Sequence, residues 1–219
     1  MGPHRKLKKM TPTLLRLAAD ARGIADAAAV IRGGGIVAIP TDTLYGLAVD
    51  PFNARAVARI FDVKGRFAER ALPLVAADIE QVIAKLGPLP TVAERLAEMF
   101  WPGPLTLLMV SSAPLAPEVS GGTGTVGVRV PAHEGLRALC RACGTPLTAT
   151  SANISGRPAT DDPDDVARTL GGCVDALLDG GKTAGGAPST IVDATGSTMR
   201  LVRPGRVPWD EVLACAHRA

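Results

Sequence analysis

Four groups of small polar and basic side chains stand at the ends of short apolar runs, where proteins often place their chemistry. The first lies in the sequence IPTDTLYGLAVD at residues 39–50, in which Thr41, Asp42, Thr43 and Tyr45 follow a proline. Such side chains need hydrogen-bond partners, which either a following helix N-terminus or a small polar ligand can supply. The local pattern leaves both interpretations open, a strand-to-helix turn or a ligand site.

The second group is KGRFAER, which brings Lys64, Arg66 and Arg70 to the end of an amphipathic helical pattern. Cations at a helix C-terminus are favoured by the helix dipole, so a solvated helix end is one interpretation. The other is a phosphate clamp, because arginine binds phosphate in a bidentate manner and lysine supplies a point charge.

The third group is TSANISG at residues 150–156, where hydroxyl, amide and backbone groups in a glycine-ended turn could bind an anion or form a simple Asx turn. The fourth group is either a basic hairpin or part of the same site. It comprises Ser189, Thr190, Arg200, Arg203 and Arg206.

Arg129 differs from these groups because it stands inside the apolar strand pattern VGVRV. A buried guanidinium requires an anion, so we expect either a ligand carboxylate or an aspartate partner beside it.

Two further motifs carry no predicted role. The sequence GGKT at residues 180–183 resembles the end of a P-loop, but Ala176 stands where the first glycine is required, so we expect an ordinary loop. The histidines His4, His133 and His217 have no nucleophile signature nearby, and a hydrolytic triad has little support.

The elements that would position these groups alternate between short β-type runs and amphipathic helices, which predicts an α/β fold with a mostly buried sheet. We expect one domain over residues 13–219, preceded at residues 1–12 by a disordered tail or an expression remnant. Expected helices cover 24–35, 53–65 with Asn53 as N-cap, 78–87 and 91–100, and expected strands cover 36–40, 72–77, 105–110, 126–130, 146–150, 174–179, 190–194 and 199–204.

Composition narrows the function classes. The 219 residues are 47% hydrophobic but contain no apolar run long enough for a membrane span, and the net charge is only +3. The four cysteines include one C-x-x-C, at Cys140 and Cys143, with no second pair at zinc spacing, which favours buried thiols in a reducing compartment.

Seven segments in order, PTDTLYGL, KGR, WPGPLTLLM, VGVRVP, TSANISG, PSTIVD and LVRPG, resemble the YrdC-type threonylcarbamoyl-AMP synthases from about residue 31 to residue 205. The resemblance implies an open, twisted mixed sheet with surrounding helices and a concave basic cavity, in the family's short, single-domain form. It implies an enzyme that converts L-threonine, bicarbonate and ATP to threonylcarbamoyl-AMP and pyrophosphate. A separate transferase would use the product to modify tRNA.

The resemblance also implies the site residues. Lys64 and Arg66 would act in catalysis by neutralising phosphate charge, and Mg²⁺ would arrive with ATP rather than occupy a dedicated protein site. Val75 stands where the family often has a histidine, so we assign it no threonine contact. The implied threonine site is Thr43, Arg129, Ala149 and Ser189, and the implied ATP site is Lys64, Arg66, Arg70, Thr125, Ser151, Asn153 and Arg203.

Three alternatives stay open: a domain of the hydrogenase-maturation carbamoyltransferases, an RNA-binding module, and an inactive or regulatory family member. Only seven residues are aromatic, too few for a base-stacking platform, so we expect at most weak tRNA binding. We further expect a cytoplasmic monomer.

Overall fold

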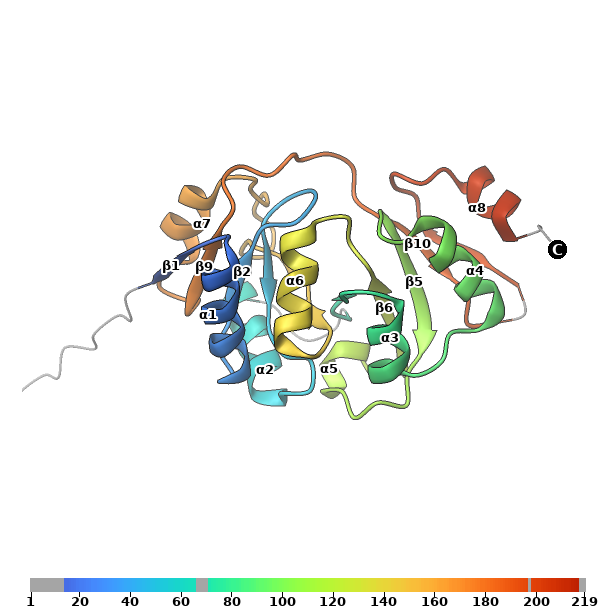
Figure 1. Ribbon diagram of the computed structural model, residues 1–219, viewed down its shortest axis with the longest axis horizontal. Coiled ribbons are helices and arrows are strands. Elements are labelled where there is room, and N and C mark those ends of the chain that lie inside the picture. The colour runs from blue at the N-terminus through green and yellow to red at the C-terminus, as the bar shows by residue number, and fades with distance from the viewer. Residues whose placement is uncertain (1–13, 66–70, 197, 217–219) are drawn as a thin grey trace, which may run out of the picture.

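The computed structural model of the protein describes residues 14–65, 71–196 and 198–216, and the predicted tail lies outside this range. Its strands form two mixed sheets with helices around them, which confirms the α/β class and divides the strands between two sheets (Figure 1). The helices are α1 (Ala21–Arg32), α2 (Ala54–Lys64), α3 (Ile79–Leu86), α4 (Thr91–Phe100), α5 (Pro117–Ser120), α6 (Glu134–Cys143), α7 (Pro163–Leu170) and α8 (Trp209–Ala216).

The first sheet has the strand order β1-β9-β2-β3-β8. Strand β9 runs parallel to both β1 and β2, while β3 is antiparallel to β2 and to β8. The central strand β2 is buried at every residue, as its continuous apolar sequence VAI predicts. The strands are β1 (Leu15–Ala18), β2 (Val37–Ile39), β3 (Gly46–Ala48), β8 (Thr150–Ser151) and β9 (Ala176–Asp179).

The second sheet has the strand order β11-β10-β5-β6-β4-β7. Helices α4 and α8 lie beside its β5 and β10 end, whereas α1 and α7 accompany the first sheet (Figure 1). The strands are β4 (Leu74–Val75), β5 (Leu105–Val110), β6 (Thr125–Arg129), β7 (Leu147–Thr148), β10 (Thr190–Asp193) and β11 (Arg200–Arg203).

Helix α2 follows its sequence signals closely. The side chain of Asn53 accepts from the backbone N–H of Ala56, confirming the predicted N-cap, and Gly65 ends the helix with a φ of 61°. Val57, Ile60 and Phe61 are buried on one face. Helix α4 covers the expected residues 91–100 and begins at Thr91; Pro90 precedes it, and no side chain caps it.

The stretch at residues 39–50 does not form the strand-to-helix turn that was one interpretation of its sequence. It turns back instead, and β3 pairs antiparallel with β2, matching Ile39 to Gly46. The next helix begins only at Ala54, so Thr41, Asp42 and Thr43 lie in the connection between two strands. The hydroxyl of Thr41 is used within this connection, where it donates to the backbone oxygen of Leu44 and accepts from the N–H of Thr43. Asp42 and Thr43 have no helix to cap and can make tertiary or ligand contacts.

The connection between β9 and β10, residues 180–189, passes from the first sheet to the second along one edge of the molecule (Figure 1). Across the part of the chain that the structure describes, no helix combines the length and apolar character needed to span a bilayer.

Candidate functional site

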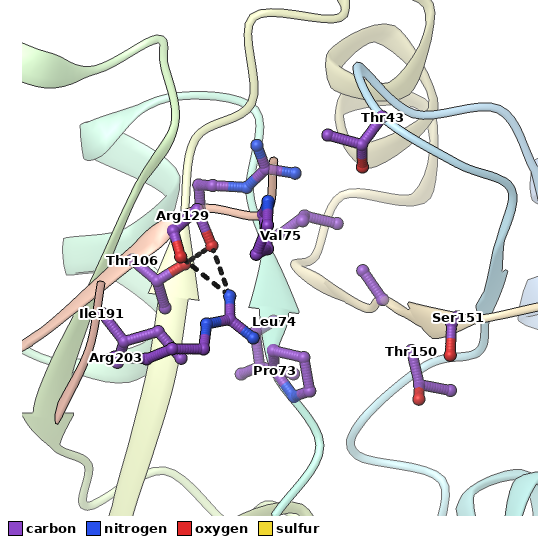
Figure 2. A pocket seen from close by; sticks show the side chains of 13 residues that line it. Thr43, Pro73, Leu74, Val75, Thr106, Arg129, Thr150, Ser151, Ile191 and Arg203 are labelled. Atoms are coloured by element: carbon purple, nitrogen blue, oxygen red, sulfur yellow. Dashed lines mark hydrogen bonds between the residues drawn. The ribbon is translucent and has the colours of Figure 1, made fainter. Parts of the chain in front are cut away.

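A cavity of about 310 Å³ is lined by residues of both sheets. In Figure 2, Thr43, Thr150 and Ser151 of the first sheet and its β2–β3 connection face Thr106, Arg129 and Arg203 of the second sheet. Six predicted ligand-binding residues line this one cavity, namely Thr43, Arg129, Ala149, Ser151, Ser189 and Arg203. The predicted concave site is therefore present, while its net charge stays a prediction.

Strand register explains the second-sheet wall of the cavity. Thr106 of β5 pairs with Ile191 of β10, and Ile191 pairs with Arg203 of β11. Cross-strand partners project from the same face of a sheet, so these side chains form one row. The pairing of Val75 with Arg129 adds two more side chains to the wall.

Arg129 has the aspartate partner that was one of its two expected anions. Its Nη1 and Nη2 atoms donate to the carboxylate of Asp42 at 2.7 and 2.9 Å, and the two side chains are only 12% and 13% exposed. The pair joins the β2–β3 connection to the second sheet. A guanidinium has five N–H donors, so three remain that can serve a ligand carboxylate.

Arg203 forms a second hydrogen-bonded cluster at the cavity, with Ser189 and Thr106. Its Nη2 atom donates to the backbone oxygen of Ser189 at 2.8 Å and to its Oγ at 3.2 Å, and that Oγ lies 2.8 Å from the hydroxyl of Thr106 (Figure 2). Partial burial lowers the pKa of Arg203, and the nearby charge of Arg129 lowers it further. An anion between the two arginines would relieve that repulsion.

Lys64 lies under the TSAN loop rather than at a solvated helix end. Its ammonium donates to the backbone oxygen and Oγ of Ser151 at 2.7 and 3.3 Å, and to the backbone oxygen and Oδ1 of Asn153 at 3.2 and 2.9 Å. The residue is only 2% exposed, so the solvated interpretation is wrong. The two sequence motifs thus form one hydrogen-bond network around the buried Lys64, completed by an exposed bond of 2.6 Å from Ser151 Oγ to Asn153 Oδ1.

Five of the seven predicted nucleotide contacts do not line this cavity. Lys64 and Asn153 are joined to it through Ser151, and the other three lie farther away or outside the described chain. Arg66 and Arg70 fall within residues 66–70, which the structure does not describe. Thr125 begins β6, four residues before Arg129, and its hydroxyl lies 2.8 Å from that of Thr123. At about 3.3 Å per residue, this puts it roughly 13 Å along the strand from Arg129.

Of the cavity residues that were not assigned a binding role from the sequence, Thr106 and Val75 are the most informative. Thr106 interrupts the apolar run LTLLMV, which is the signal that could have identified it. Val75 lines the cavity with a side chain that is 2% exposed, so the wall is apolar there.

Comparison with known proteins defines the class to which this fold and cavity belong. Residues 29–205 match the Sua5/YciO/YrdC family model, which carries the description "Telomere recombination". Because the match covers well over half of the chain, the protein belongs to this family.

Two curated relatives within this family carry the name of a particular enzyme. The chain is 42% identical over 186 residues to the threonylcarbamoyl-AMP synthase of Pyrococcus abyssi, a match that covers 85% of this chain and 55% of the relative. It is 39% identical over 192 residues to the enzyme of that name from Bacillus subtilis, covering 87% and 56%. The chain thus spans about half the length of these two curated relatives.

Among solved structures, the crystal structure of P. abyssi Sua5 complexed with L-threonine superposes with a TM-score of 0.85 at 39% identity, covering 92% of this chain and 60% of that one.

Proposed function

We propose that the protein is an L-threonylcarbamoyladenylate synthase, a nucleotidyltransferase that makes threonylcarbamoyl-AMP and pyrophosphate from L-threonine, bicarbonate and ATP. One observation carries the proposal. The family resemblance assigns four residues to threonine binding, and all four line one cavity between the two sheets. They are Thr43, Arg129, Ala149 and Ser189. The threonine-bound P. abyssi structure, which shares this fold, supports the same choice of substrate.

The chemistry of the cavity fits an amino acid. Arg129 retains donors for the carboxylate beyond those that it gives to Asp42. The hydroxyls of Thr43 and Ser189 can hold the polar side chain and amine, together with the backbone at Ala149. A desolvated site makes each of these hydrogen bonds stronger than it would be in water.

The nucleotide would lie against Arg203 and the loop that carries Ser151 and Asn153. Arg66, Arg70 and Thr125 remain proposed contacts on the family resemblance. Among the described residues, no cluster of three or more histidine, cysteine or acidic side chains could hold a metal ion, and Asp42 is engaged by Arg129. On the family resemblance, we propose that Mg²⁺ arrives with ATP and is bound by its phosphates.

The proposed reaction has two bond-forming steps. The threonine amine attacks the carbon of bicarbonate, giving the N-carboxylate with loss of water, and a carboxylate oxygen then attacks the α-phosphorus of ATP and displaces pyrophosphate. Two anions must meet in the second step, so positioning and charge neutralisation by the arginines are the main requirements. No protein nucleophile is needed.

Substrate coupling tests the proposal. Pyrophosphate release should require threonine and bicarbonate together. An ATPase would release phosphate from ATP alone, and an amino-acid adenylating enzyme would release pyrophosphate without bicarbonate. Ser151→Ala should slow the coupled reaction by roughly tenfold to a thousandfold, as the loss of one preorganised donor typically does. Release of pyrophosphate without bicarbonate would refute the assignment.

We further propose that a separate transferase uses the product to form threonylcarbamoyladenosine in tRNA, and that the protein is a cytoplasmic monomer. Direct tRNA binding should be weak and should fall steeply with salt, because phosphate contacts release counterions. Tight, sequence-selective tRNA binding without ATP would favour the RNA-binding alternative.

A further inference from the structure

The glycine-rich sequence GGKT belongs to the connection between β9 and β10, and this connection ends at the cavity. Pro188 and Ser189, at its C-terminal end, line the cavity wall. The segment is not a P-loop, but its course brings it against the Thr41–Tyr45 connection of the first sheet.

Two donors of this segment converge on one acceptor. The hydroxyl of Thr183 donates to the backbone oxygen of Thr43 at 2.6 Å, and the N–H of Gly185 donates to the same oxygen at 2.8 Å. A carbonyl oxygen has two lone pairs, and both are used here. The backbone of Thr43 is thereby held from outside while its side chain lines the cavity.

The segment itself has a fixed course. The N–H of Thr183 donates to the backbone oxygen of Asp161 at 3.0 Å, and the hydroxyl of Tyr45 donates to that of Gly181 at 2.8 Å. Gly181, Gly185 and Gly186 have φ values of 73°, 66° and 105°, which only glycine adopts readily. The backbone around Thr183 is therefore held by hydrogen bonds where its hydroxyl donates to Thr43.

Lys182, the neighbouring residue, makes a different kind of contact. Its ammonium lies 3.1 Å from the carboxylate of Asp162, and its side chain is 72% exposed. An exposed ion pair of this kind contributes little. The lysine that a P-loop would use is thus directed to the surface, and the threonine beside it makes the contact with the site.

We propose that Thr183 is a positioning residue for substrate binding, which acts by fixing the backbone of Thr43 and so the direction of its hydroxyl. The proposal rests on the proposed function, because it takes L-threonine as the ligand of that hydroxyl. It assigns a role to a segment that the sequence marks only as a loop.

The test compares three variants. Thr183→Val keeps the shape but removes the donor, Thr183→Ser keeps the donor, and Lys182→Ala is the control on the exposed neighbour. Thr183→Val should raise the KM for L-threonine about three- to tenfold, the effect of one lost hydrogen bond, with the KM for ATP and the kcat little changed. Thr183→Ser and Lys182→Ala should both resemble the wild type.

A second measurement does not depend on activity. Amide exchange at Tyr45, whose N–H donates to the backbone oxygen of Thr160 at 2.9 Å, should be faster in Thr183→Val than in Lys182→Ala. If the wild-type protein binds no threonine but exchange is still faster in Thr183→Val, the proposed function is overturned and the positioning of the Thr43 backbone is supported. Unchanged exchange and KM in Thr183→Val, or equal losses in the valine and serine variants, would overturn the inference.

Discussion

Replacing Lys64 by methionine separates two roles for this residue, a direct phosphate contact and the support of a loop. An ammonium has three hydrogens, and four oxygen atoms of Ser151 and Asn153 lie within 3.3 Å of Lys64 Nζ. Its donors are therefore directed at the loop. Methionine preserves the apolar stem and removes the charge, so the four oxygen atoms would lose their charged donor.

The size of the effect follows from burial. Lys64→Met leaves neutral oxygen atoms without their charged donor, and a hydrogen bond to a charged group contributes about 1.5–3 kcal/mol. In a protein of this size each 1 kcal/mol shifts the melting temperature by about 2–4 °C. Lys64→Met should therefore lower the melting temperature by roughly 3–12 °C.

Thermal unfolding followed by circular dichroism measures this shift, and Lys85→Met is the matched control. Lys64 lies in the last turn of α2 and Lys85 in the last turn of α3, but the side chain of Lys85 is exposed. The control should change stability by less than about 0.5 kcal/mol. An unchanged melting temperature in Lys64→Met, together with a large loss of ATP affinity, would refute the loop-support argument and favour direct contact with phosphate.

Three other predictions concern Arg129, Asp42 and His133. Arg129→Ala should abolish threonine binding in calorimetry while largely sparing ATP binding, since the carboxylate loses its charge-assisted pair, and unchanged threonine affinity in the folded variant would make Arg129 purely structural. Asp42→Asn should reduce the free energy of unfolding by about 1–3 kcal/mol in denaturant titration, because the bidentate pair joins the two sheets, and full wild-type stability would contradict this. Burial lowers the pKa of His133, whose Nδ1 accepts a hydrogen bond from the N–H of Leu136. Protonation of this imidazole therefore favours the unfolded chain, and the free energy of unfolding should fall as the pH drops from about 7 to about 5. His133→Asn, which keeps a capping acceptor, should flatten that decline, and an unaltered pH dependence would show that other groups cause it.

Local sequence patterns determined the elements that depend on neighbouring residues. The apolar spacing and the Asn53 cap predicted α2, and the β-type runs predicted β5, β6, β9 and β10 within one or two residues. Continuing the buried spacing of residues 57, 60 and 61 by one turn reaches Lys64, so its inward direction was also encoded locally. The strands β1 and β3 were missed. Strand β3 lies in the stretch at residues 39–50, which was interpreted as a turn or a ligand site, and it is formed by pairing with β2.

The contacts that build the site depended on partners far away in the chain. Lys64 bonds to Ser151 across a separation of 87 residues, Arg129 to Asp42 across 87, and Thr183 to Thr43 across 140. The sequence by itself determined the helix faces, the caps and the types of side chain that could bind an anion. Only the tertiary structure decided that Arg129 pairs with Asp42 and that GGKT contacts Thr43. The partner of a polar group is selected by strand pairing and packing over the whole chain rather than by its neighbours in sequence.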